Sequence, residues 1–97
     1  MHAVIILPAA QIEASEAQDW YEAETRGLGA AFRAELDNAV QRLTANPLQF
    51  PLVFADIRRA LLRRFPYALF FRIVDDAVFV MACFHSSRDP RIWQDRT

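Results

Sequence analysis

Two nearly continuous apolar runs in the last third of the chain, residues 67–74 and 77–84, constrain its fold more than any other feature. Both runs are rich in Phe, Val and Ile, and Asp75 and Asp76 separate them, which is typical of two strands joined by a tight turn. Because successive side chains of a strand point to opposite faces, these strands carry apolar side chains on both faces. We therefore predict a central β-hairpin with one face covered by helices and the other by residues 86–97, a second copy of the chain or a partner's helix.

Two amphipathic helices are predicted before this hairpin. The first covers residues 9–24, and its apolar stripe at helical spacing consists of Ala10, Ala14, Ala17 and Tyr21. The stripe of the second helix consists of Leu28, Phe32, Leu36, Ala39, Val40 and Leu43. Gly27 and Gly29 interrupt the pattern between the helices, and Asn46-Pro47 ends the second helix. The sequence therefore predicts an antiparallel helical hairpin.

Two further strands complete the predicted order. Residues 2–7 form a short apolar run that Pro8 closes, as at a junction between a strand and a helix. Residues 57–64 mix apolar residues with four arginines, which is typical of an edge strand whose charges discourage unwanted pairing. The expected fold class is α+β, with the order β-α-α-β-β-β and the helical hairpin packed on a small antiparallel sheet.

Length and composition narrow the class of protein. A chain of 97 residues suits a single core, so we expect one domain over residues 1–97. A hydrophobic fraction of 54% excludes an intrinsically disordered chain. Cys83 is the single cysteine and cannot form an internal disulfide, no signal peptide is recognisable, and the apolar runs are far shorter than the roughly 20 residues that cross a bilayer. We therefore expect a cytoplasmic protein with no membrane partner.

The two parts of the chain differ in charge, although the net charge is −1. Residues 1–56 carry three arginines against eight acidic residues, whereas residues 57–97 carry eight arginines against four acidic residues. Such a basic region steers anionic partners, either nucleic acid or an acidic protein segment, and it is equally compatible with an ordinary solvated sheet face. All 11 basic residues are arginines, so chemistry that depends on a lysine amine is excluded.

The segment that follows the last apolar run carries the candidate chemistry. His85 can transfer a proton near neutral pH and Arg88 can hold a phosphate, a pair suited to phosphodiester cleavage. The alternative is structural, because a histidine at a strand end often anchors the following loop, and Trp93 can either stack a base or pin the tail to the core. No cofactor or metal is expected, because a glycine-rich phosphate loop is absent and His2, His85 and Cys83 lack the spacing of metal ligands.

Several short motifs, in a consistent order along almost the whole chain, carry a family resemblance. In the helical part they are Trp20-Tyr21-Glu22, Gly27-Leu28-Gly29, Phe32, Asn46-Pro47 and Phe50-Pro51. In the sheet and the tail they are Arg58-Arg59-Ala60-Leu61, Phe65-Pro66-Tyr67, His85, Arg88-Asp89-Pro90 and Trp93. Together they resemble the ParE/RelE superfamily of bacterial type II toxins, also known as plasmid stabilization system proteins. The resemblance implies the β-α-α-β-β-β order, a cognate antitoxin encoded beside the chain, and growth inhibition when the antitoxin is lost.

The superfamily contains two activities. RelE-like members are ribonucleases that cut messenger RNA in the ribosomal A site, using basic residues on the central strands with a Tyr, His or Glu in support. In this chain Ala68 stands where many of them have an arginine, and Trp93 or Gln94 stands at the tail position that often supplies a catalytic tyrosine. Arg88 alone lies where a RelE-type phosphate-binding arginine would be.

ParE-like members lack the ribonuclease set and poison DNA gyrase through protein contact, which this pattern fits better. The resemblance therefore implies a ParE-like toxin that acts by binding rather than catalysis and is neutralised by an acidic antitoxin in a hetero-oligomer. The residues expected to bind the target are Arg63, Arg64, Arg88, Arg91 and Trp93. The residues expected to bind the antitoxin are Ile12, Phe70 and Arg72.

Two alternatives stay open. The first is a RelE-like endoribonuclease that acts on messenger RNA in the ribosome, with Arg88 bracing the scissile phosphate, His85 transferring a proton and Arg64 assisting. The second is a non-toxic interaction module of the same fold.

Overall fold

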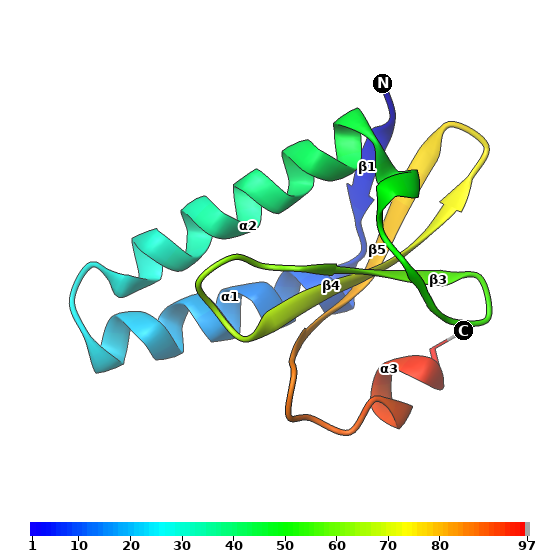
Figure 1. Ribbon diagram of the computed structural model, residues 1–97. Coiled ribbons are helices and arrows are strands. Elements are labelled where there is room, and N and C mark those ends of the chain that lie inside the picture. Colours follow the sequence, from blue (N-terminus) through cyan, green and yellow to red (C-terminus); the bar gives the residue numbers. More distant parts are fainter. Residues whose placement is uncertain (97) are drawn as a thin grey trace.

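A five-stranded sheet carries a long helical hairpin on one face in the computed structural model, which describes residues 1–96 (Figure 1). Its helical segments are α1 (Pro8–Glu24), α2 (Leu28–Ala45), the single 3₁₀ turn η1 (Pro47–Gln49) and the short α3 (Arg91–Gln94). Its strands are β1 (Ala3–Ile6), β2 (Leu52–Phe54), β3 (Ile57–Leu61), β4 (Tyr67–Val74) and β5 (Ala77–His85). Within residues 1–96, every helix is too short or too polar to span a membrane. The predicted α+β fold class is confirmed.

The sheet is mixed rather than purely antiparallel. Its strand order is β1-β5-β4-β3-β2, and β1 runs parallel to β5, whereas the other neighbouring pairs are antiparallel. The expectation of an antiparallel sheet is therefore corrected at β1. The apolar pattern of β1 indicates a strand but not its direction, and a parallel pair needs the long connection that α1, α2 and three strands supply here.

The short strand β2 is not predicted by the sequence pattern, and it replaces β3 at the edge of the sheet. It pairs with the outer side of β3, so the expectation that residues 57–64 form the edge strand is wrong. In addition, β3 ends at Leu61, which leaves Arg63 and Arg64 in the bend before β4. Only three residues lie between Pro51 and Ala55, and three are too few to show the alternating pattern of a strand. Ala55, with a φ of 50°, follows the end of β2.

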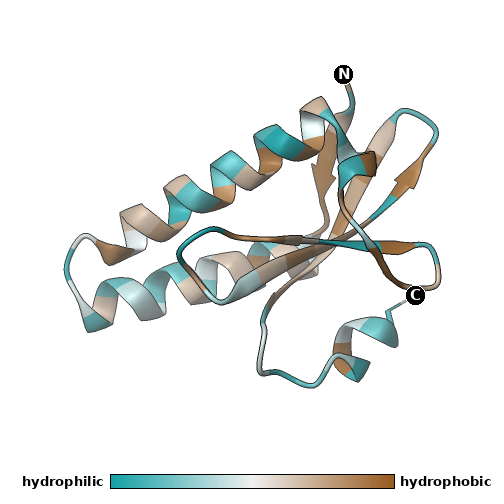
Figure 2. Cartoon of the chain, in the orientation of Figure 1, coloured by the Kyte–Doolittle hydropathy of each residue, from teal (hydrophilic) through white to brown (hydrophobic). Residues whose placement is uncertain are grey.

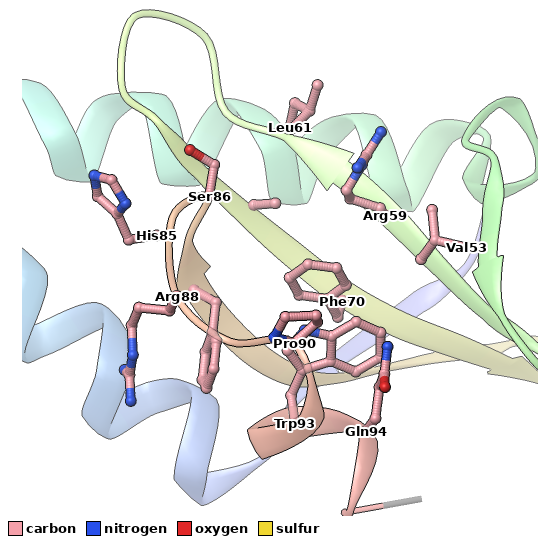
Figure 3. A pocket seen from close by; sticks show the side chains of 12 residues that line it. Val53, Arg59, Leu61, Phe70, His85, Ser86, Arg88, Pro90, Trp93 and Gln94 are labelled. Atoms are coloured by element: carbon pink, nitrogen blue, oxygen red, sulfur yellow. The ribbon is translucent and has the colours of Figure 1, made fainter.

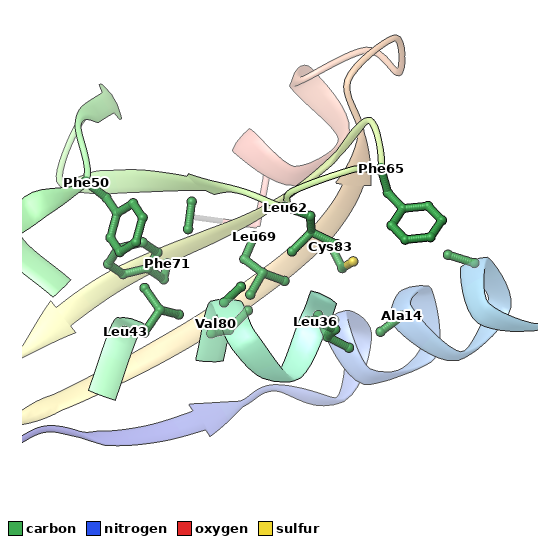
Figure 4. Close-up of a cluster of buried hydrophobic side chains, with 14 of the residues drawn as sticks. Ala14, Leu36, Leu43, Phe50, Leu62, Phe65, Leu69, Phe71, Val80 and Cys83 are labelled. Atoms are coloured by element: carbon green, nitrogen blue, oxygen red, sulfur yellow. The ribbon is translucent and has the colours of Figure 1, made fainter. Parts of the chain in front are cut away.

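The helical hairpin covers one face of the sheet through the two predicted stripes. The buried residues of α1 are Ala10, Ala14 and Ala17. The buried residues of α2 are Gly29, Phe32, Leu36, Ala39 and Leu43. Figure 4 shows Leu36 and Leu43 directed toward the strand residues Leu69, Phe71 and Val80, which belong to the same cluster. Helical periodicity therefore predicts this half of the core correctly.

The turn between the two helices depends on glycine and on a capping carboxylate. Gly27 adopts a φ of 88°, which is favourable for glycine and strained for other residues. The Glu22 carboxylate accepts the backbone N–H groups of Gly27 and Gly29, at 3.0 to 3.1 Å. These bonds satisfy amide groups at the start of α2 that have no partner inside the helix.

A β-bulge in β5 gives the second face of the sheet an additional apolar residue. The pairing with β4 skips Met81, since Phe70 lies opposite Ala82 and Phe71 lies opposite Val80. As a result, Met81 and Ala82 both belong to the buried cluster on the second face.

The tail, which follows β5, covers the centre of this second face. The sequence analysis does not decide between the tail and a partner as the cover of this face. Trp93 of α3 is 2% exposed and stacks on Phe70 with 4.1 Å between the ring centroids. Figure 1 shows α3 across the central strands from α2, and Figure 2 shows apolar residues concentrated on the central strands. The edge of the face remains uncovered, because Leu52, Val53 and Phe54 of β2 are all exposed.

Candidate binding site

A hollow of about 300 Å³ opens on the second face of the sheet, beside the tail (Figure 3). Its apolar walls are Val53, Leu61, Ala68, Phe70, Phe84, Pro90 and Trp93. Its polar lining residues are Arg59, His85, Ser86, Arg88 and Gln94. None of the described residues that line this tail hollow is acidic, so its charge favours an anionic group on an apolar stem.

The ion pair between Asp89 and Arg91 begins α3 and thereby places Trp93 over the sheet. Asp89 Oδ1 accepts the Arg91 backbone N–H at 3.0 Å, and Arg91 Nη2 donates to Asp89 Oδ2 at 2.7 Å. These hydrogen bonds from Arg91 hold the pKa of the Asp89 carboxyl below its ordinary value. The guanidinium of Arg91 is therefore engaged within the chain, although its side chain is exposed.

His85 stands at the rim of the tail hollow with its proton position set by the next loop residues. The Ser87 backbone N–H donates to His85 Nδ1 at 3.0 Å, and Ser87 Oγ lies 2.7 Å from the same nitrogen. Because Nδ1 accepts a hydrogen bond, the proton of the neutral imidazole is on Nε2. Nε2 is then a donor. Nδ1, the one nitrogen of the neutral ring that can take up a proton, already accepts the hydrogen bond from Ser87. This arrangement matches the structural alternative, in which the histidine anchors the loop.

Arg88 lies between the tail hollow and a second, smaller hollow beside α1. Its guanidinium carbon is 4.2 Å from the centroid of the Phe84 ring, a cation–π contact. Figure 3 shows the Arg88 side chain extending from its loop toward α1 rather than toward Trp93. It lines the second hollow together with Glu16, Trp20 and others. Arg88 is thus an exposed cation at the boundary of the site.

Arg59 is a lining residue to which the sequence analysis assigns no role. Register places it on β3 opposite Phe70, and its Nε is fully shielded from solvent without a hydrogen-bond partner among residues 1–96. The preceding residue, Arg58, donates to the Phe50 carbonyl through Nη1. Arg42 of α2 donates to the Leu61 carbonyl through Nη2, and its Nε, like that of Arg59, is shielded without a partner among residues 1–96. Arg59 belongs to one of the family motifs, but its burial depends on strand pairing and is not readable from the sequence.

A second ion pair fixes the tail beyond α3. Arg96 Nη2 donates to Glu13 Oε2 of α1 at 2.7 Å, and these side chains are only 29% and 13% exposed. Glu13 Oε1 also accepts the Cys83 backbone N–H, and Arg96 Nη1 donates to the Met81 carbonyl. Because β1 ends opposite Val80, this pair supplies partners to backbone groups of β5 that have no neighbouring strand.

The other residues expected to bind the target lie elsewhere. Arg63 lines a shallow hollow with residues of α2, on the side of the helical hairpin. Arg64, with a φ of 73°, stands over the Phe65 ring in the bend before β4. The structure therefore brings Arg88 and Trp93 to one hollow and leaves Arg63 and Arg64 outside it.

The three residues expected to bind the antitoxin lie on different elements. Ile12 is 58% exposed on α1. Phe70 on β4 is buried beneath Trp93, and Arg72 on the same strand donates to both carboxylate oxygens of Asp56. A partner that contacts Ile12 and a partner that contacts Arg72 therefore approach separate surfaces.

Residues 1–96 contain no group of three His, Cys, Asp or Glu side chains placed to hold a metal ion. Cys83 is buried in β5, and burial raises the pKa of its thiol to about 12. Its thiol is therefore protonated near neutral pH, and the residue acts as a small apolar side chain of the core.

Residues 4–90 match the family model described as the ParE toxin of the type II toxin-antitoxin system parDE. The chain belongs to this family. A comparison with curated proteins gives no match.

Solved structures of low sequence identity share the fold. A chain of the chromosomal ParDE toxin-antitoxin system from P. aeruginosa matches with a TM-score of 0.72 and 19% identity, over 88% of this chain and 96% of that chain. A chain of the intact E. coli RelBE toxin-antitoxin complex matches with a TM-score of 0.66 and 20% identity, over 91% of this chain and 100% of that chain. The isolated E. coli RelE toxin matches with a TM-score of 0.65 and 19% identity, over 99% and 96%. The resemblance to the ParE/RelE superfamily is confirmed.

Proposed function

We propose that this chain, as one cytoplasmic domain, inhibits growth by binding a macromolecular target, DNA gyrase, rather than by cutting RNA. Membership of the ParE family supports the proposal. The observation that carries it is the state of His85, whose Nδ1 accepts a hydrogen bond from Ser87. No other described residue that lines the tail hollow can serve as a proton-transfer group near neutral pH, since arginine stays charged and serine, glutamine and tryptophan stay neutral.

The proposed contacts with the target are the exposed arginines. Arg63, Arg64 and Arg88 have no carboxylate partner among residues 1–96 and are therefore free to form bidentate pairs with a partner protein. Trp93 and Arg91 contribute indirectly in this proposal, because one is packed on Phe70 and the other is paired with Asp89.

We further propose an acidic antitoxin as the partner that neutralises the chain in a hetero-oligomer. The structural neighbours from P. aeruginosa and E. coli are described as toxin-antitoxin systems, which supports such a partner here. The excess of arginine in residues 57–97 supports an acidic one. An acidic segment that is disordered alone and folds on binding is suited to wrap a surface of this kind.

Two assays on the same protein test the target. We expect the purified chain to inhibit supercoiling by gyrase, and we expect primer extension on messenger RNA from induced cells to show no cuts in phase with codons. Codon-phased cuts together with normal supercoiling would show that the chain is a ribonuclease and not a gyrase inhibitor. Induction without growth arrest would leave only a non-toxic interaction module.

The second candidate, a ribosome-dependent endoribonuclease, is favoured by the meeting of Arg59, His85 and Arg88 at one hollow. A proton transfer by His85 requires that the Ser87 hydrogen bond to Nδ1 is broken, because Nδ1 is the nitrogen that would take up the proton. A variant His85→Gln keeps a polar side chain at the loop but cannot transfer a proton, so codon-phased cuts that disappear in this variant would establish the ribonuclease.

A further inference from the structure

The Nε–H group of Arg59 is shielded from solvent and lacks an acceptor among residues 1–96. The register between β3 and β4 places Arg59 opposite Phe70, and both residues line the tail hollow. Shielding a cationic N–H from water without an acceptor is costly. An acceptor supplied by another molecule accounts for a cation at this position.

The charges around Arg59 select an anion. Arg88 and His85 line the same hollow, and the hydrogen bond to His85 Nδ1 makes Nε2 a donor. The described lining residues include no carboxylate that could neutralise these groups. Two carboxylates of neighbouring segments are already paired, Asp89 with Arg91 and Asp56 with Arg72.

The surroundings favour an acidic protein segment over a nucleic acid. Binding to RNA depends on several free cations that follow the phosphate backbone. Here Arg72, Arg91 and Arg96 each pair with a carboxylate of the same chain, and the unpaired Arg63 and Arg64 lie outside the hollow, which leaves Arg59 and Arg88 as its arginines. The walls of the hollow are mainly apolar, and exposed apolar side chains of β2 and Leu61 continue from its edge. A carboxylate on an apolar stem, with apolar neighbours, complements this surface better than a polyanion.

We propose that the tail hollow binds an acidic side chain of the antitoxin, with Arg59 as the main ligand of the carboxylate. Arg88 at the rim attracts the same group, and apolar residues beside it in the antitoxin segment pack on Val53 and Leu61. This inference rests on the proposed function, because it assigns the antitoxin to a particular surface. It also explains how an antitoxin can cover Arg88, one of the proposed target contacts.

A small-molecule titration of the full chain tests the site without the antitoxin. The probe is 3-phenylpropanoate, a carboxylate on an apolar stem, and the matched neutral compound is 3-phenylpropanamide. Fluorescence of Trp93, which lines the hollow, reports binding in a Trp20→Phe background, since these are the two tryptophans of the chain. We expect a saturable change with the carboxylate and a weaker one with the amide. Substituting Arg59→Gln should weaken carboxylate binding by about tenfold.

The controls separate this site from general charge effects and from the proposed function. Arg26→Gln removes the same charge at the exposed turn between α1 and α2, and it should bind the probe like the parent. Arg88→Gln, at an exposed loop position, provides a second variant and should weaken binding by a smaller factor.

Equal binding of acid and amide, or unchanged binding in Arg59→Gln, would overturn the proposal. Tighter binding of the dinucleotide uridylyl-uridine than of 3-phenylpropanoate would also overturn it, in favour of a nucleic-acid site. The titration contains no gyrase, so its failure leaves the supercoiling assay as an independent test of toxicity.

Discussion

Single residues in this chain have effects that residue type alone does not predict, and Gly29 is the clearest case. It lies in the first turn of α2, where glycine ordinarily weakens a helix relative to alanine. A Cβ at this position would lie 2.9 Å from the Gln18 carbonyl oxygen and 2.9 Å from Glu22 Cβ. Close packing of α1 against α2 therefore depends on the missing side chain.

We predict that Gly29→Ala destabilises the protein by about 1–3 kcal/mol, because the new methyl group meets the backbone of α1. Urea unfolding followed by tryptophan fluorescence measures the change in the free energy of unfolding. The matched control is Ala34→Gly at an exposed position of α2, which should cost about 0.5–1 kcal/mol through helix propensity alone. A gain in stability for Gly29→Ala would show that the two helices are farther apart.

At the scale of elements, α3 depends on neighbours more than on its own helical propensity. It has four residues, too few for a stable isolated helix. The Asp89–Arg91 pair holds its first turn and the Trp93 ring packs on Phe70. The bulge in β5 acts at the same scale, since it turns Met81 and Ala82 toward the face that α3 covers.

We predict that α3 loosens in acid. The Asp89 pKa is lowered by Arg91, so its contribution to stability is fully present above the ordinary carboxyl pKa of about 3.9 and is lost as the pH falls through the lower pKa of the folded state. In a Trp20→Phe background, Trp93 fluorescence should shift to longer wavelength across this range.

Two variants test this assignment of the acid transition. Asp89→Asn should show the shifted spectrum at neutral pH, whereas Asp56→Asn, which removes the other exposed carboxylate of lowered pKa, should keep the acid transition. Loss of the acid transition in Asp56→Asn instead would assign it to the Arg72 pair.

At the scale of the whole molecule, the Glu13–Arg96 pair joins parts of the chain that are far apart in sequence. It connects α1, the bulged end of β5 and the tail through hydrogen bonds to the Cys83 N–H and the Met81 carbonyl. Hydrogen bonding to Glu13 and the coulombic attraction of its carboxylate raise the pKa of Arg96 above its ordinary value, so the guanidinium stays charged.

We predict that Glu13→Gln lowers the free energy of unfolding by about 1–3 kcal/mol, because Arg96 and the end of β5 lose a charged, partly buried acceptor. The control is Glu16→Gln on the same helix, at an exposed position, which should change stability by less than about 0.5 kcal/mol. A double-mutant cycle with Arg96→Gln measures the coupling. Additive losses in that cycle would contradict a shared role in fixing the tail.

Much of the candidate site lies beyond prediction from the sequence. His85, Arg88 and Trp93 are predicted because they directly follow a strong apolar strand, and they do line one hollow. Arg59 is not predicted, since arginine in an apparent edge strand suggests a solvated side chain, whereas in the structure β3 lies between β2 and β4 and the Arg59 Nε is shielded from solvent. The antitoxin assignments of Phe70 and Arg72 likewise depend on contacts with Trp93 and Asp56 that sequence spacing does not reveal.

The amino-acid sequence by itself determines the helical hairpin, the central β-hairpin and the family, because apolar periodicity, glycine and proline positions and short motifs act over a few residues. Only the tertiary structure decides the direction of β1, the position of β2 at the edge, the covering of the second face by Trp93 and the shielding of the Arg59 Nε. Each of these features arises from pairing between segments that are distant along the chain. The paired segments share the free energy gained by burying apolar surface and by hydrogen-bonding their backbone groups, and local sequence patterns do not identify which segments pair.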